Sequence, residues 1–226
     1  MAVFCFSHTA KSEPFYWNAF DLKVKSQKVT PLLELLDETF TFSDKPFKVT
    51  LAEYVFSNDD RTHGLDLSSS NIDALSSVMD TDDIKTERDQ FKKKFYDLVE
   101  IKSKYSGIRL ITTNPPVEGV DKKKQNDYFA IWEMEVTEPK KYATAFTEML
   151  SKTKNLRKQH TAGLGGYLFG RGKKTHYVLH SFSSYADLVK SLSAYEENTD
   201  FQQFMKLAKP LYTGVDNAVF KIVKQW

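Results

Sequence analysis

Cysteine is almost absent from this chain of 226 residues: Cys5 is the single one. An intrachain disulfide framework is therefore excluded, and a reducing compartment is expected. No apolar run approaches the roughly 20 residues that a membrane-spanning helix needs. The net charge is only +2, so neither nucleic acid nor an anionic membrane is expected as a partner. Residues 1–10 lack the basic and apolar regions of a signal peptide, and we therefore predict a cytoplasmic protein.

A repeated segment is the most informative feature that the chain does contain. Residues 62–75 recur at residues 175–188: both segments begin with Thr-His, and two serines and the final leucine coincide. Just upstream, at the same offset, a leucine, a tyrosine and a phenylalanine coincide as well. A chain of this length suits two modules of about 100 residues each. Two copies indicate a duplicated module, because a solenoid needs three or more repeats.

The two copies share one predicted order of elements. In the first copy we expect strands at 15–24, 48–56, 63–69 and 107–113, a helix from Thr30, and a helical region from Asn71 through Ile101 with a break at 80–83. In the second we expect strands at 129–136, 161–170, 175–182 and 218–224, and helices at 142–150, 184–192 and 201–209. Both copies therefore read β-α-β-β-α-β, the split βαβ unit of ferredoxin-like folds.

Between the copies lies a stretch that is typical of a linker. It contains Pro115, Pro116, Gly119 and a run of lysines. The predicted organisation is repeat 1 at residues 1–114, with an N-terminal extension at 1–14, a linker at 115–127, and repeat 2 at 128–226.

Two segments resemble a known group of proteins. Residues 198–204 followed by 209–211, and residues 175–182 followed by 184–187, are similar to parts of antibiotic-biosynthesis-monooxygenase-like proteins. Two βαββαβ units in one chain likewise resemble the dimeric α+β barrel superfamily. The resemblance implies an α+β fold in which two ferredoxin-like repeats form an intrachain barrel. Each sheet would have strand order 4-1-3-2, with the helices outside.

The resemblance also implies a class of function. We expect a small-molecule enzyme of monooxygenase-like type, acting on an apolar or aromatic compound in repeat 2. The alternatives are a non-catalytic protein that binds a small ligand or haem, and a structural or interaction module with a filled pocket. No cofactor is predicted, and haem held by His160, His176 or His180 enters only by analogy. Because one chain supplies both halves of the barrel, we expect a monomer or a weak homo-oligomer.

The predicted site lies between the sheet and the helices of repeat 2. A hairpin loop at residues 171–174 would pair Gly165 with His180, at a position where the first copy has Leu67. Glycine inside a strand often marks the close approach of a ligand, so His180 is the candidate general base or hydrogen-bond donor. The predicted ligand-binding residues are Trp132, Gly163, Gly165, Tyr167, Phe169 and His176. In the alternative, Trp132, Phe182 and Tyr185 fill this space.

No metal site is predicted. His176 and His180 are four residues apart, which on a strand separates their Cα atoms by roughly 13 Å.

The opposite face of the sheet carries charged residues in both copies. We place Asp21, Glu53, Asp66 and Glu133 there, with Arg109 and Lys221 on the closing strands. Isolated buried charges are very costly, so we predict an ion-pair network between the repeats. A proton-transfer site formed by Asp21 and Glu133 is the alternative.

Overall fold

Eight antiparallel strands form a closed barrel in the computed structural model, which describes residues 15–41, 46–80, 85–113, 127–157 and 160–226. The strands are β1 (Phe15–Val24), β2 (Lys48–Phe56), β3 (His63–Ser69), β4 (Val99–Thr112), β5 (Tyr128–Val136), β6 (Ala162–Phe169), β7 (His176–Phe182) and β8 (Tyr212–Gln225). Their order around the barrel is β1-β3-β2-β8-β5-β7-β6-β4. Each half therefore has the predicted order 4-1-3-2, and the fold is the expected α+β barrel.

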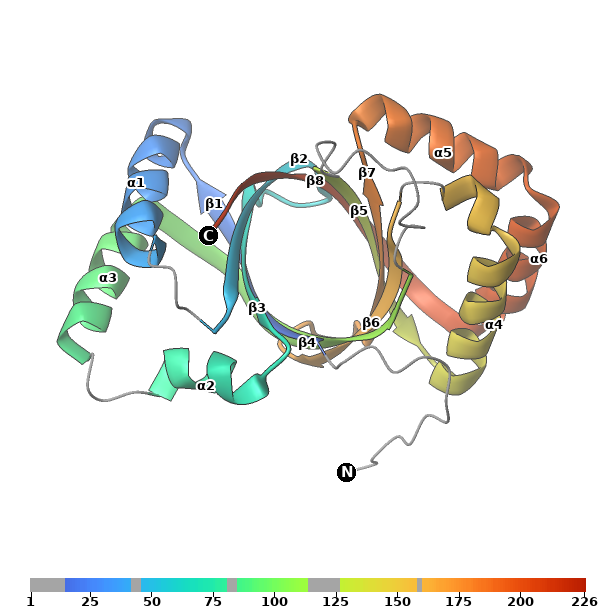
Figure 1. Cartoon of the computed structure of the whole chain (residues 1–226), viewed down its shortest axis with the longest axis horizontal. Coiled ribbons are helices and arrows are strands. Elements are labelled where there is room, and N and C mark those ends of the chain that lie inside the picture. The colour runs from blue at the N-terminus through green and yellow to red at the C-terminus, as the bar shows by residue number, and fades with distance from the viewer. Residues whose placement is uncertain (1–14, 42–45, 81–84, 114–126, 158–159) are drawn as a thin grey trace.

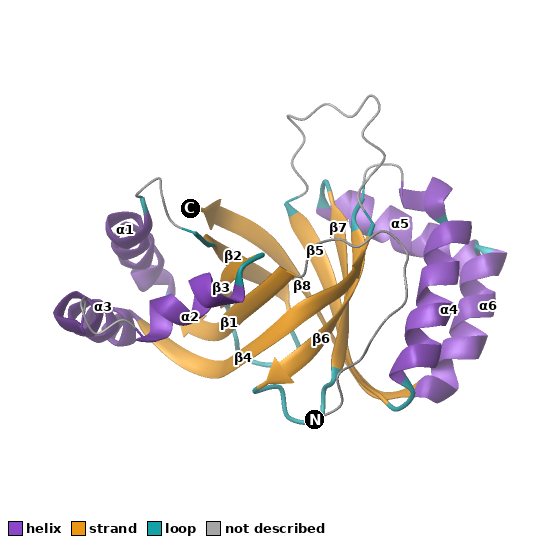
Figure 2. Ribbon diagram, turned by 60° about the horizontal axis from the view of Figure 1, so that its bottom comes forward, coloured by secondary structure: helices purple, strands orange, loops and turns teal. Residues whose placement is uncertain are grey.

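The helices lie outside the barrel in two groups, one beside each half (Figure 1). The first half has α1 (Val29–Phe40), α2 (Ile72–Asp80) and α3 (Lys85–Leu98), and the second has α4 (Pro139–Lys152), α5 (Tyr185–Glu197) and α6 (Thr199–Ala208). Figure 2 shows the two groups on opposite sides of the tilted strands. None of the described helices is long and apolar enough to cross a membrane.

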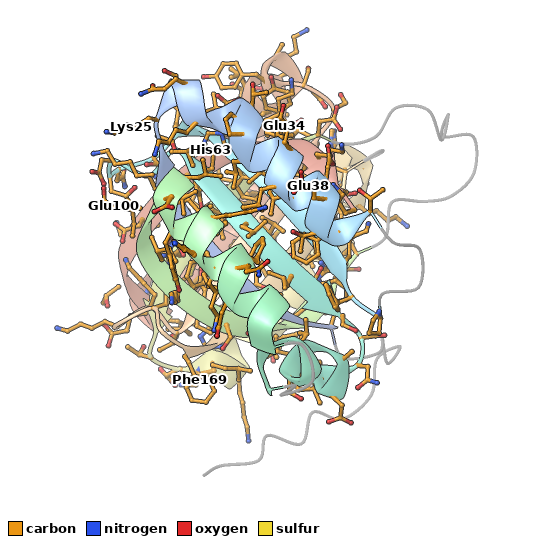
Figure 3. All side chains as sticks on the ribbon, turned by 90° about the vertical axis from the view of Figure 1, so that its left-hand side faces the viewer. Lys25, Glu34, Glu38, His63, Glu100 and Phe169 are labelled. Carbon is orange, nitrogen blue, oxygen red and sulfur yellow. The ribbon has the colours of Figure 1, made fainter. Side chains whose placement is uncertain are left out.

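Alternation along the strands gives each sheet two faces. In β1, Leu22 and Val24 face the helices and join a core with Leu32, Leu36 and other apolar residues. Figure 3 shows α1 and α3 lying over this sheet, with His63 beside α1. The second half buries an equivalent core under α4 and α6, around Phe146 and Phe204. The residues between these positions face the inside of the barrel.

The two closing strands are longer than the sequence indicated. β4 begins at Val99 rather than at residue 107, and β8 begins at Tyr212 rather than at residue 218. Val99 and Ile101, predicted at the end of a helix, belong to the strand. The reason is tertiary: the added part of β4 pairs with β1, and the added part of β8 pairs with β5. Of the predicted linker 115–127, only Asp127 is among the described residues.

A glycine in β4 is required by the packing inside the barrel. A Cβ atom at Gly107 would lie 2.2 Å from Trp17 Cζ2 and 2.7 Å from the backbone oxygen of Gly166. Gly64 in β3 has no such conflict, because a Cβ atom there would lie 3.6 Å from the Tyr54 ring, an ordinary contact.

We therefore expect Gly107→Ala to lower the free energy of unfolding by about 1–3 kcal/mol, the usual effect of overpacking. Urea denaturation monitored by tryptophan fluorescence measures this change. Gly64→Ala is the matched control and should change the stability by less than about 0.5 kcal/mol. Equal losses in the two variants would contradict the packing argument.

Candidate functional site

The hairpins β2–β3 and β6–β7 lie at the same end of the barrel. This follows because all neighbouring strands are antiparallel, so β1 and β5 run in the same direction. Four charged side chains meet at this hairpin end: Asp21 from β1, Glu133 from β5, and Arg61 and Arg171 from the two hairpin loops. Their side chains are only 2–12% exposed. We call these four residues the charge cluster. Its formal charges cancel.

Arg171 connects the two carboxylates of the charge cluster. Its Nε and Nη2 donate to the two oxygens of Glu133 at 2.7 and 2.8 Å, a bidentate contact. Its Nη1 donates to Asp21 Oδ2 at 2.5 Å. Arg61 Nη1 donates to the same Asp21 oxygen at 3.0 Å, and Arg61 Nη2 lies 3.8 Å from Glu133 Oε2. The cluster thus joins residues of both halves of the chain.

Hydroxyl groups complete the hydrogen bonding of the two carboxylates. Asp21 Oδ1 accepts from the hydroxyls of Tyr54 and Tyr105 at 2.8 and 2.9 Å, and Oδ2 also accepts from Ser103 Oγ at 2.7 Å. Tyr167 donates to Glu133. Burial alone would raise the pKa of Asp21, but the guanidinium groups of Arg171 and Arg61 hold it below its usual value.

The predicted ion-pair network between the repeats is therefore present, with a changed membership. Asp21 and Glu133 belong to it, whereas Glu53 pairs with His63 on the helix side of β2 and β3. Lys221 lies opposite Tyr128, also on the outer face. Because five donors already occupy the oxygens of Asp21, this carboxylate is poorly suited to take a proton from a ligand.

The turn glycine Gly170 allows Arg171 to enter the barrel. Its φ is +87°, and a Cβ atom would lie 2.1 Å from the backbone oxygen of Lys104. The hairpin loop therefore lies directly on β4 and returns Arg171 to the inside.

Replacing Arg171 by methionine should leave two buried carboxylates with only Arg61 as a cationic partner. We expect the free energy of unfolding at pH 7 to fall by about 3–5 kcal/mol. The loss of stability should be smaller in acid, because the partners of Asp21 lower its pKa in the folded protein. The stabilisation by this ion pair is fully present above the pKa of Asp21 in the unfolded chain, and it disappears as the pH falls through the lower pKa of the folded protein.

Chemical denaturation at several pH values between 7 and 3 measures this dependence. Lys174→Met is the control: Lys174 lies in the same hairpin loop as Arg171 and pairs with the exposed Asp216 on β8. Its replacement should cost less than about 1 kcal/mol. A loss for Arg171→Met that is small, or constant with pH, would contradict the electrostatic role.

An aromatic layer lies next to the charge cluster inside the barrel. The rings of Trp17, Tyr105, Tyr167 and Tyr177 are in mutual contact, with centroids 5.3–5.8 Å apart. Trp17 Nε1 donates to the Tyr177 hydroxyl at 2.8 Å. Gly165 leaves the space for Tyr177, because a Cβ atom there would lie 2.0 Å from the ring.

A cavity of about 280 Å³ lies beyond this layer, toward the other end of the barrel. It is lined by the end of β4, the start of β5, the start of β6 and the end of β7. The lining residues are Arg109, Thr112, Phe129, Thr161, Gly163, Leu164, Tyr177, Leu179 and Ser181. The Thr112 hydroxyl is buried and has no hydrogen-bond partner among the described residues. We call this space the barrel cavity.

One cation and one acid determine the electrostatics at this end. Arg109 lines the barrel cavity, and its guanidinium lies 4.3 Å from the centre of the Phe15 ring. Asp66 on β3 lies within electrostatic range of both Arg109 and Tyr177. Burial raises the pKa of Asp66 to about 7, although Ser68, Arg109 and Lys48 oppose the shift. This carboxyl group therefore exchanges a proton near neutral pH, as a general acid or base must.

The predicted pairing of the second hairpin was wrong by three residues. Gly165 pairs with Tyr177 and Gly163 with Leu179, whereas Ala162 pairs with His180. The last residues of β6 pair with β4 instead of with β7, as at Phe169 and Ser106, so the β6–β7 pairing stops earlier than expected. A shift by an odd number reverses the faces, so Gly163 and Gly165 lie inside the barrel and His180 lies outside.

The predicted site residues therefore divide between two faces. Gly163 lines the barrel cavity, and Gly165 and Tyr167 also face the inside. His180, His176 and Trp132 lie on the helix side, where Trp132 packs against the second core. Phe169 is 77% exposed at the end of β6 and points away from the protein in Figure 3. The structure does not bring these residues together.

The space around His180 is filled, as the alternative interpretation expected, by Phe182 from the predicted set together with Tyr195 and His160. The His180 ring contacts Phe182, Tyr195 and His160, at centroid distances of 4.6, 5.4 and 6.0 Å. His160 and His180 are only 8% and 6% exposed. These histidines do not fit a haem ligand, because aromatic rings pack directly against both of them and neither lines the barrel cavity. The catalytic role predicted for His180 stays a prediction.

Burial also lowers the pKa of His180, from 6.5 to about 3. The unfolded chain binds a proton as the pH falls below 6.5 and the folded chain does not, so this histidine destabilises the fold in acid. We expect His180→Leu to become more stable relative to the native protein as the pH falls from 7 to 4, by on the order of 1–3 kcal/mol. Denaturant titrations of both proteins across this range test it, and parallel pH profiles would contradict it.

The sequence identified only part of this site. Asp66 and Arg109 were placed on the correct face, because alternation along a strand is readable. Gly163 was predicted as a ligand-binding residue, but the other lining residues of β5, β6 and β7 were missed, since the face of each strand depended on the register. Arg61 and Arg171 were also missed: they follow turn residues, where a basic residue usually lies in solvent. Four acids were placed on the inner face with only two cations, Arg109 and Lys221, and this excess of carboxylates was the signal that could have revealed them.

No protein-family description and no curated protein matches the sequence. Solved structures do match. A protein of Fusobacterium nucleatum subsp. nucleatum, provisionally named a monooxygenase, is 15% identical and aligns over 93% of each chain with a TM-score of 0.63.

Two further structures extend this comparison. An anthrone oxidase-like protein is 12% identical over 97% of this chain and 95% of its own, with a TM-score of 0.62. A protein provisionally named a chlorite dismutase is 12% identical over 93% of this chain and 95% of its own, with a TM-score of 0.55. This chain has the dimeric α+β barrel fold. At such identities the similarity of this α+β barrel to its neighbours establishes the fold alone.

Proposed function

We propose that this α+β barrel is a small-molecule enzyme of the monooxygenase-like type that acts on an apolar or aromatic compound in the barrel cavity. The observation that carries the proposal is the cavity itself: about 280 Å³, with Phe129 and Leu179 as apolar walls and Arg109 and Tyr177 as polar groups. A concave, largely apolar space with a few polar groups is typical of small-molecule sites. The names of the structural neighbours support the same class.

The residues of the cavity suit the activation of an acidic substrate. Asp66 does not line the cavity itself, but it lies within electrostatic range of the lining residues Arg109 and Tyr177. With its pKa raised by burial to about 7, it can take up the proton that a weakly acidic C–H or O–H group of the substrate releases near neutral pH. Arg109 then stabilises the negative charge that develops on the substrate. With dioxygen as oxidant, an activated CH₂ group becomes a carbonyl: one oxygen atom enters the substrate and the other leaves as water with the two hydrogens.

Two neighbouring residues on β7 allow a direct test, because they point to opposite faces of the sheet. Leu179 lines the barrel cavity and His180 packs under the helices. We expect Leu179→Phe to narrow the cavity and to reduce turnover of anthrone by at least about tenfold, while His180→Leu keeps the native rate. Oxygen consumption and product absorbance measure turnover in each variant, and circular dichroism confirms that each is folded.

Each other outcome has a defined meaning. Loss of turnover in His180→Leu, with Leu179→Phe unaffected, would move the site to the helix side. Binding of aromatic compounds that Leu179→Phe abolishes, without any oxygen consumption by the native protein, would favour the second candidate function, a non-catalytic ligand-binding protein. Absence of both binding and turnover would contradict the proposal.

A further inference from the structure

The charges inside the barrel are unevenly distributed. At the hairpin end, Asp21, Glu133, Arg61 and Arg171 pair with one another. At the other end, Arg109 lines the cavity, and no described carboxylate lies within 4.0 Å of its guanidinium. Its close neighbour is instead the face of the Phe15 ring. Arg109 is thus a partly buried cation whose charge the described part of the barrel does not pair.

The acid next to Arg109 offsets this charge only in part. Asp66 is half-buried, and burial raises its pKa to about 7, so its carboxyl group changes charge near neutral pH. The groups that act on Asp66 are Arg109 on β4, Lys48 on β2, Ser68 on β3 and Tyr177 on β7. The potential in the cavity is therefore positive below neutral pH.

Two hydroxyl groups add donors to the same space. The Thr112 hydroxyl is buried without a partner among the described residues. The Tyr177 hydroxyl accepts from Trp17, and burial raises its pKa well above the usual range, so it keeps its proton. A guanidinium and two hydroxyls on one cavity form a site for an oxygen anion. Phe129 and Leu179 provide apolar surface beside it.

We propose that the ligand of the barrel cavity carries an oxyanion, a carboxylate or an ionised phenol or enol, on a small aromatic body, and that Arg109, Thr112 and Tyr177 bind this oxyanion. The inference rests on the proposed function, since it specifies the ligand of the same cavity. Asp66 sets the pH range: below pH 7 it is neutral and the anion is attracted, whereas above pH 7 its carboxylate repels the anion.

Benzoate and benzamide provide a matched pair of probes, because they have the same shape and differ in charge. Isothermal titration calorimetry on the full chain should show benzoate binding at least about tenfold more tightly than benzamide at pH 6. Benzoate affinity should fall by about three- to tenfold between pH 6 and pH 8 as Asp66 ionises, while benzamide affinity stays constant. Benzoate itself is ionised at both values.

Four variants assign the effect to the named residues and to the cavity. Arg109→Gln should make the affinities for benzoate and benzamide equal. Thr112→Val should lower the affinity for benzoate and leave the affinity for benzamide unchanged. Asp66→Asn should hold benzoate affinity at its pH 6 value up to pH 8. Leu179→Phe should abolish the binding of both probes, which locates them in the cavity. Thermal unfolding checks that each variant is folded.

Different results would overturn the oxyanion site and the proposed small-molecule function of the cavity. Equal affinity for benzoate and benzamide, or unchanged benzoate binding in Arg109→Gln, would overturn the oxyanion site and leave the cavity as an aromatic-binding site. Failure of both probes to bind would overturn the inference and the proposed use of the cavity together.

Discussion

The charge cluster is the interaction on which the arrangement of this barrel depends. Two carboxylates from β1 and β5 face inward at the same end, and burying them is tolerable only because Arg61 and Arg171 enter from the hairpin loops. Since Arg171 binds Asp21 of one half and Glu133 of the other, the cluster also fixes the relative position of the halves. The hairpin end is thereby filled with neutralised charge.

The remaining interior follows from this arrangement. Trp17 and three tyrosines form a layer next to the cluster, and two of those tyrosines donate to its carboxylates. Glycines at 107 and 165 provide the space that the large rings need. The free volume is left at the opposite end of the barrel, together with Arg109 and Asp66. A small molecule held there would meet the one region of the described interior where charges are not already paired.

The candidate site depended on strand register more than on residue type. His180 was a reasonable choice from its lack of a counterpart in the first repeat. Glycines 163 and 165 did mark a place where side-chain bulk is absent. The two observations belong to different faces, because the hairpin pairing differs by three residues from the one that the turn sequence indicated. Register set by long-range pairing with β4 cannot be read from the hairpin alone.

The sequence by itself determined the element order and the inward position of Asp21, Asp66 and Glu133, because alternation and the spacing of turns are local properties. The 4-1-3-2 order of the sheets came from the resemblance to ferredoxin-like barrels. Only the tertiary structure decided which strands close the barrel, how long β4 and β8 are, and which face of β7 meets a cavity. It also decided the role of the two hairpin arginines. Each of these depends on contacts between segments more than 30 residues apart, and their free energies arise only when both partners are in place.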